Sequence, residues 1–232
     1  MQTSVRGMCG RFVRTTPIDQ LIELFAIHEV DCDLPPSYNV APGQPVLAIT
    51  GGPERRLRCF KWGLVPFWAK DASIGSRMIN ARAETLAEKP AFRQAFKKRR
   101  CVIPADGYYE WRKEEDGKTP AYFYSATEEP FAFAGLYELW QTPDGGVLQS
   151  CAIVTTEPNE LARTAHHRMP VILREHEIDL WLDDRVQDET ALKALLKAIP
   201  AEAMRCHDVS TRVNSPRNDT PECIEPVRKH EL

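Results

Sequence analysis

The sequence predicts an α+β fold, a single domain in which a curved, largely antiparallel, barrel-like β-sheet is flanked by helices. Strand-like segments joined by hairpin turns are concentrated in the middle of the chain, whereas helical patterns lie towards both ends. A length of 232 residues, 43% of them hydrophobic, is sufficient for one large core. No repeat or low-complexity linker divides the chain, so we expect one domain.

The first helix is indicated by its N-terminal signals. Thr16 is a suitable N-cap, Pro17 fits the first helical position, and an acidic residue follows in the first turn. The apolar residues that then share one face are Leu21, Leu24 and Phe25. We expect this helix to end near Ala26.

Two strands and a second helix are expected next. Residues 46–50 and 57–62 have strand-like composition and are separated by a turn at 51–53 that contains two glycines and a proline. Pro90 then opens a short helix, because proline is favoured at the first helical position.

The centre of the chain is rich in strands. We expect them at residues 101–103, 107–112, 121–125, 131–138 and 148–155. Asp116-Gly117 and Asp144-Gly145-Gly146 are typical hairpin turns. Beyond these hairpins, helices are expected at residues 157–165, 175–182 and 188–198, with a strand from Val171 to Leu173.

A net charge of −3 gives the chain no general attraction to nucleic acid. Any contact with DNA therefore depends on a local basic surface. The densest basic run, Lys97–Arg100, is equally consistent with a solvated helix end.

The seven cysteines include no CxxC pair and are odd in number, and the chain has no signal peptide or long apolar run. We therefore expect reduced cysteines, a cytoplasmic location and no membrane segment. Cys206 and His207 offer two zinc ligands, but their spacing from other ligands supports a zinc site poorly, and we expect no metal.

Cys9 follows Met8 and becomes an N-terminal residue if that methionine is removed. An N-terminal cysteine carries a thiol and an α-amine on adjacent carbons, and both are partly nucleophilic near neutral pH. With an aldehyde, the amine forms a Schiff base and the thiolate closes a thiazolidine ring. The alternative is a small buried cysteine at the start of a strand.

Four further segments are rich in residues that do chemistry. They are Tyr38–Gly43, Trp62–Trp68 with Asn80–Thr85 after it, Asp106–Trp111 and His166–Pro170. Together with Met8–Arg11, they resemble the SOS-response-associated peptidase (SRAP) family, whose members process abasic sites in DNA. The resemblance covers nearly the whole chain, through Asn214–Arg217 and Pro221–Cys223.

The resemblance implies four catalytic residues. Cys9 matches the cysteine that becomes residue one and links covalently to an abasic site. Asn80 matches the active-site asparagine, whose amide can orient the α-amine or a sugar hydroxyl. Glu110 matches a proton-transferring glutamate, and His166 a histidine that protonates the opening sugar. From the residues alone, Asn80 also suits a turn, Glu110 a solvent-facing strand position and His166 a structural role.

DNA-binding roles follow in the same way. The residues that the resemblance assigns to DNA binding are Arg11, Asn39, Pro42, Trp68, Arg82 and Arg168. Guanidinium groups suit phosphate oxygens, and flat side chains can stack on bases or wedge strands apart. Trp62 fits either this cleft or ordinary core packing.

The head of the chain departs from the family pattern, because residues 1–7 precede Met8. As written, Cys9 has an amide nitrogen and cannot form a thiazolidine. Translation from Met8, self-cleavage before Cys9 and persistence of a blocking extension are the three explanations, and we favour the first. We accordingly divide the chain into an extension (1–8), one SRAP-like domain (9–222) and a tail (223–232).

The resemblance thus implies a protein of the DNA damage (SOS) response that forms a thiazolidine crosslink, reversible with help from Glu110, between Cys9 and abasic sites in single-stranded DNA. The alternative is a cysteine peptidase that cleaves its own propeptide before Cys9. We expect a monomer that needs no cofactor and is associated with the nucleoid when bound to DNA.

Overall fold

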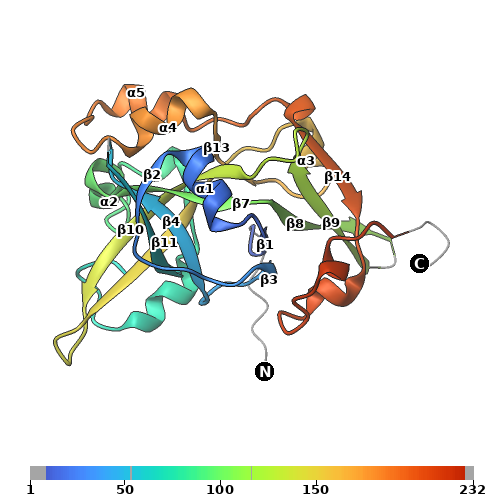
Figure 1. Cartoon of the computed structure of the whole chain (residues 1–232), viewed down its shortest axis with the longest axis horizontal. Coiled ribbons are helices and arrows are strands. Elements are labelled where there is room, and N and C mark those ends of the chain that lie inside the picture. The colour runs from blue at the N-terminus through green and yellow to red at the C-terminus, as the bar shows by residue number, and fades with distance from the viewer. Residues whose placement is uncertain (1–8, 53, 116, 228–232) are drawn as a thin grey trace.

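The computed structural model describes residues 9–52, 54–115 and 117–227 (Figure 1). The predicted extension, residues 1–8, lies outside the described residues. So do Pro53 and Asp116 of two predicted turns and the last five residues of the predicted tail.

A closed barrel of five strands forms the centre of the fold and confirms the predicted barrel-like sheet. Its strands are β4 (Pro45–Thr50), β5 (Arg55–Trp62), β7 (Arg100–Ala105), β10 (Phe131–Gln141) and β11 (Val147–Thr156). Around the ring, β11, β10, β7, β4 and β5 pair antiparallel in turn. A parallel pairing of β5 with β11 closes it.

Short strands extend the barrel into a sheet of nine strands within the described residues. They are β2 (Ile27–Val30), β6 (Asn80–Arg82), β12 (Met169–Pro170) and β13 (Ile172–Leu173). β6 and β12 both pair with β11, and β13 pairs with β10. The strand predicted at 171–173 corresponds to β13, and β12 precedes it outside the predicted range.

A second, antiparallel sheet has the order β14-β9-β8-β1-β3. Its strands are β1 (Phe12–Arg14), β3 (Ser37–Val40), β8 (Gly107–Glu114), β9 (Gly117–Ser125) and β14 (Met204–Asp208). In Figure 1, β8, β9 and β14 lie at the right of the barrel, and the β10–β11 hairpin extends to the lower left.

The helices are short. They are α1 (Ile18–Phe25), α2 (Arg93–Lys98), α3 (Glu160–Arg163), α4 (Glu175–Leu182) and α5 (Glu189–Ala194). Further 3₁₀ turns span Ala72–Arg77, Ala83–Thr85, Ala201–Ala203, Thr211–Asn214 and Pro221–Cys223. Pro90 does not open α2, which begins three residues later with Phe92 as its N-cap. α3 starts later than predicted, because Asn159, whose side chain accepts from Ala162 N, is its N-cap, and it is only a single turn long.

Alternate residues of the barrel strands divide between two apolar clusters, as expected for side chains that alternate across a strand. One cluster, which includes Leu47 and Val102, packs against α1, α2, α4 and α5. The other includes Phe60 and Phe133 and continues into residues of the second sheet and Cys9. Cys9 therefore lies where the two sheets meet.

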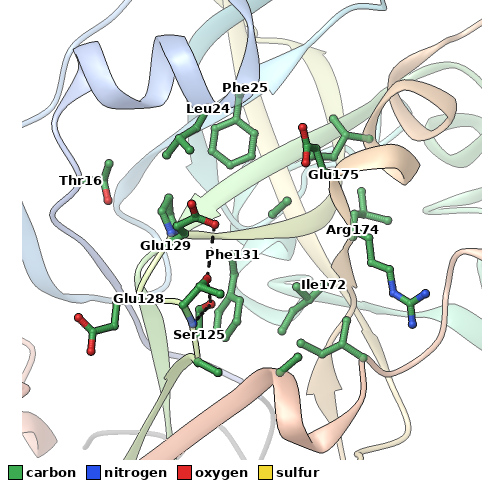
Figure 2. A pocket seen from close by; sticks show the side chains of 18 of the residues that line it. Thr16, Leu24, Phe25, Ser125, Glu128, Glu129, Phe131, Ile172, Arg174 and Glu175 are labelled. Atoms are coloured by element: carbon green, nitrogen blue, oxygen red, sulfur yellow. Dashed lines mark hydrogen bonds between the residues drawn. The ribbon is translucent and has the colours of Figure 1, made fainter.

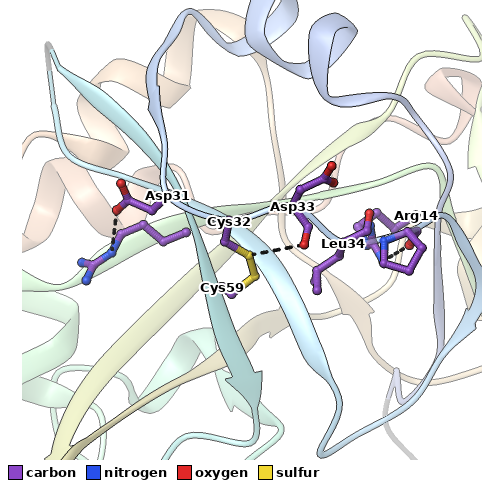
Figure 3. The surroundings of a disulfide bond; sticks show 8 residues. Arg14, Asp31, Cys32, Asp33, Leu34 and Cys59 are labelled. Carbon is purple, nitrogen blue, oxygen red and sulfur yellow. Dashed lines mark hydrogen bonds and ion pairs between the residues drawn. A yellow bond between two sulfur atoms is a disulfide. The ribbon is translucent and has the colours of Figure 1, made fainter.

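Two of the cysteines that we expected to be reduced are joined. Cys32 and Cys59 form a disulfide with their Cα atoms 5.8 Å apart (Figure 3). The disulfide links the β2–β3 connection to β5. Two residues after Cys32 in the same connection, Leu34 O accepts a hydrogen bond from Arg14 at 2.9 Å. The expectation of a fully reduced chain is thus wrong, because residues 27 apart in sequence meet in space. No helix among the described residues is long and apolar enough to cross a membrane.

Candidate active site

Strand pairing brings Cys9 to Glu110. β1 pairs antiparallel with β8, with Phe12 opposite Tyr108. Glu110 lies two residues beyond Tyr108 and so projects from the same face of β8, beside the residues that precede β1. Cys9 is 2% exposed and Glu110 5% exposed, so both lie in the interior.

A single barrel strand positions two further residues. β6 runs parallel to β11, with Asn80 opposite Ile153, and β12 pairs with the end of β11, with Pro170 opposite Thr155. β11 therefore brings Asn80 and the segment around His166 to the same place. Asn80 and His166 are far apart in sequence, so the sequence alone does not show that they lie close together.

The four predicted catalytic residues converge. Asn80 Nδ2 donates to Cys9 O at 3.1 Å, and His166 Nδ1 lies 3.9 Å from Glu110 Oε1. The Cys9 thiol donates weakly to Arg168 O at 3.8 Å. Since these side chains come from four separate segments, their convergence makes a candidate active site.

Burial sets the protonation states of this cluster. It raises the pKa of the Cys9 thiol well above its ordinary value, and the neighbouring Glu110 charge raises it further. Burial also raises the pKa of Glu110 to about 7, against opposing effects of Cys9 and Lys118. The pKa of His166 is lowered, again chiefly by burial. Near neutral pH the thiol and the imidazole are therefore neutral, and Glu110 can both give and take a proton.

The cluster also contains polar atoms without partners. Among the described residues, Asn80 Oδ1, Tyr108 OH, Glu110 Oε1 and Arg168 Nε are buried and form no hydrogen bond. Buried polar atoms are rarely left unpaired in folded proteins. Acceptors and donors gathered around one nucleophile are suited to a polar ligand.

Arg11 and Asn39 are used inside the protein. Arg11 Nη1 donates to Asn39 Oδ1 at 2.8 Å and to Val213 O at 2.7 Å. Asn39 is 1% exposed, and its Nδ2 donates to three carbonyls between Val213 and Asn218. Its amide therefore anchors this C-terminal loop, and a direct DNA contact by Asn39 stays a prediction. Arg11 is half-buried, and burial lowers its pKa.

The remaining DNA-binding candidates differ in exposure. Arg82 is exposed, Trp68 is 48% exposed and Pro42 is partly exposed, so all three can reach a ligand. Arg168 is 8% exposed and is paired with Glu84. Trp62 is buried and donates from Nε1 to Ile79 O at 2.9 Å, which settles its role as core packing.

Three residues near the site escaped the sequence reasoning. Tyr108 and Glu84 lie in segments that were singled out because of other residues. Only the structure shows that Tyr108 OH is buried without a partner and that Glu84 pairs with Arg168. Lys118 lowers the pKa of both Glu110 and His166 by its charge. A lysine at a hairpin turn carries no sequence signal for such a position.

A large groove lies apart from this cluster. It holds about 1020 Å³ between α1, the β9–β10 turn and the start of α4, and none of the four catalytic candidates lines it (Figure 2). Its charged lining residues are Glu23, Glu128, Glu129, Glu175, Glu202 and Arg174. This acidic excess disfavours phosphate groups. Among the described residues, no group of three His, Cys, Asp or Glu side chains is arranged to hold a metal ion.

Known proteins resemble the chain in sequence. Residues 8–216 match the family model described as SOS response associated peptidase (SRAP). The chain is 47% identical over 222 residues to the abasic site processing protein YoqW of Bacillus subtilis, covering 94% of this chain and 99% of that protein. It is 36% identical over 226 residues to the abasic site processing protein HMCES of Gallus gallus, covering 83% and 66% respectively.

Solved structures share the fold. A protein from Bacteroides thetaiotaomicron superimposes with a TM-score of 0.87 at 28% sequence identity, covering 95% of this chain and 100% of that one. A protein from Bordetella bronchiseptica superimposes with a TM-score of 0.77 at 25% identity, covering 87% and 100%. The arrangement of barrel and second sheet is thus shared with these proteins.

Proposed function

Because the chain belongs to the SOS response associated peptidase family, we propose that it processes abasic sites in single-stranded DNA during the DNA damage response, by forming a covalent crosslink through Cys9. The observation that carries the proposal is the convergence of Cys9, Asn80, Glu110 and His166 in one buried cluster with unpaired polar atoms. The names of the relatives YoqW and HMCES support an abasic-site substrate.

The chemistry requires Cys9 as the first residue. The α-amine attacks the aldehyde carbon of the opened sugar, and the carbinolamine loses one water to form an imine. The thiol then adds across the C=N bond, with sulfur joining carbon and the proton passing to nitrogen. The product is a thiazolidine, and the net change is the loss of one water.

Proton transfer is the task that Glu110 suits. With a pKa of about 7, its carboxyl can protonate the departing hydroxyl and accept the thiol proton. Asn80 holds the Cys9 carbonyl, which fixes the residue that carries both nucleophiles. His166, 3.9 Å from Glu110, is the group that we assign to opening the sugar ring.

DNA contacts follow from exposure and charge. We assign phosphate binding to the exposed Arg82 and base stacking to the exposed Trp68, with Pro42 at the edge of the cleft. Arg168 is buried, and its assignment to phosphate rests on its charge and its unpaired Nε instead. Arg11 shapes this surface indirectly, through the loop that it holds with Asn39. No cofactor is needed for the reaction, because the aldehyde and the aminothiol supply its electrophile and nucleophiles.

The test compares two forms of the protein on a denaturing gel. Protein beginning at Cys9 is mixed with single-stranded DNA that contains one abasic site, beside the 1–232 chain and Cys9→Ser. We expect a heat-stable shifted band only with the Cys9-first form. No band from that form would refute crosslinking, and an equal band from the 1–232 chain would show that the α-amine is unnecessary.

Self-cleavage before Cys9 is the second candidate function. The family description and the carboxyl of Glu110 beside the thiol favour it. The raised pKa of the thiol opposes it, because the thiolate is the nucleophile in such a reaction. Intact mass of the 1–232 chain over time decides between them, since self-cleavage removes residues 1–8 without any added enzyme.

A further inference from the structure

The guanidinium of Arg168 is fixed from two sides. Its Nη1 and Nη2 donate to the two carboxylate oxygens of Glu84 at 2.7 and 3.0 Å, and Nη2 also donates to Thr155 O. A two-pronged arginine–carboxylate pair fixes orientation as well as charge. Burial acts to raise the pKa of Glu84, but hydrogen bonds and the charge of Arg168 outweigh it, so the pKa is lowered and the carboxylate is ionised.

The backbone of Arg168 touches both neighbours in the active site. Its N–H donates to His166 Nδ1 at 3.1 Å, and its carbonyl oxygen lies 3.3 Å from the same ring nitrogen. Its carbonyl accepts the Cys9 thiol at 3.8 Å. Movement of Arg168 would therefore disturb Cys9 and His166 together.

One donor of Arg168 is left over. Nε is buried and has no hydrogen-bond partner among the described residues. An unpaired buried donor destabilises the folded protein, and more so when the group is charged. Such a donor, aligned by a carboxylate on the other edge of the guanidinium, is suited to an oxygen of an anionic ligand.

From this geometry we infer that Glu84 is a positioning residue for DNA binding: it holds Arg168 so that the unpaired Nε–H of the guanidinium meets a phosphate of the strand that carries the abasic site. The inference rests on the proposed function and deepens it. The predicted effect of removing the Glu84 charge on DNA affinity is opposite to the usual one, because a carboxylate near DNA ordinarily repels phosphate. Removing a merely repulsive carboxylate strengthens binding, whereas removing a positioning one weakens it.

A matched control lies next to Glu84. Glu157 is exposed and lines the same recess of about 510 Å³ as Glu84, but it makes no ion pair with Arg168. Glu157→Gln removes the same charge from the same neighbourhood. It should leave DNA binding unchanged or slightly stronger.

The experiment measures binding of the Cys9-first protein to labelled single-stranded DNA with a tetrahydrofuran abasic analogue, which has no aldehyde, at several salt concentrations. Glu84→Gln should weaken binding about five- to tenfold and reduce the salt slope by about 0.7, one phosphate contact on a single strand. Arg168→Gln should weaken binding and reduce the salt slope by similar amounts. The double variant, with both Glu84→Gln and Arg168→Gln, should lose no more affinity than Arg168→Gln alone. Arg168→Lys, which keeps the charge but not the two-pronged pair, should resemble Glu84→Gln, and Glu84→Asp should recover part of the affinity.

The outcomes separate this inference from the function beneath it. If wild type crosslinks to a natural abasic site but Glu84→Gln binds the analogue like Glu157→Gln, only the inference is overturned. Further loss in the double variant would also overturn it, because Glu84 would then act independently of Arg168. If Cys9-first wild type neither binds the analogue nor crosslinks to a natural abasic site, both the proposed function and this inference are refuted.

Discussion

The imidazole of His166 faces the carboxyl of Glu110, with Nδ1 3.9 Å from Oε1. Burial raises the pKa of the carboxyl to about 7 and lowers that of the imidazole. Both shifts favour uncharged groups, so near neutral pH the imidazole is neutral, the carboxyl is only partly ionised, and the two do not form a permanent ion pair. A pair in this state can pass protons without first breaking a strong salt bridge.

The buried carboxyl should reduce stability, and Glu110→Gln should therefore stabilise the 1–232 chain. Between its ordinary pKa of 4.5 and the folded value of about 7, the folded chain holds a proton that the unfolded chain has released. Stability consequently falls as the pH rises through this window and remains lower above it. The advantage of Glu110→Gln should grow by about 2 kcal/mol between pH 5 and pH 8.

Urea denaturation of both proteins at the two pH values measures this difference. Glu129→Gln is a suitable control, since Glu129 is exposed and distant from Cys9 in the acidic groove. A pH-independent difference between wild type and Glu110→Gln would contradict the raised pKa.

The hairpins of the fold could be predicted from the sequence because their information is local. β10 and β11 are long and joined by a glycine-containing turn, as expected. β1 and β6 were not expected, since three residues show no periodicity. The parallel pairing of β5 with β11 that closes the barrel is likewise invisible in sequence, because distant segments form it.

The four catalytic candidates came from a family resemblance, and the structure brings them together. Residue type alone did not show how each polar group is used. Asn39 looked available for DNA, yet its amide is consumed by three carbonyls. The pairing of Cys32 with Cys59 was missed for the same reason, because spacing along the chain does not reveal which cysteines meet.

The Cys32–Cys59 disulfide should stabilise the oxidised chain. Linking residues separated by 27 positions restricts the unfolded chain and contributes about 3 kcal/mol in the chain-entropy account. Urea denaturation with and without dithiothreitol should show this loss for wild type and none for Cys32→Ser. Thiol titration of the denatured chain should find five free cysteines when oxidised and seven when reduced. Seven in both conditions would show that the bond does not form in solution.

Arg82 should contribute one phosphate contact. It is exposed at the end of β6, two residues after Asn80. Arg82→Ala should weaken binding to intact single strands and lower the salt slope by about 0.7. The control is Arg185→Ala, because Arg185 is exposed and paired with Asp183, outside the candidate site. Unchanged affinity and slope for Arg82→Ala would remove Arg82 from the DNA-binding surface.

Release of a preformed crosslink should distinguish Glu110 from His166. Formation and reversal share the imine, so a group that moves the proton in one direction also serves the other. Glu110→Gln keeps the shape of the side chain but cannot transfer a proton, so it should slow release by roughly 10²- to 10⁴-fold at most. His166→Ala should chiefly slow formation from the closed sugar and affect a pre-opened aldehyde less. The measurement follows adduct release onto excess competitor DNA for the two variants and wild type, with folding checked by circular dichroism. Release from Glu110→Gln at the wild-type rate would leave Glu110 as a buried structural residue and remove the central proton-transfer step.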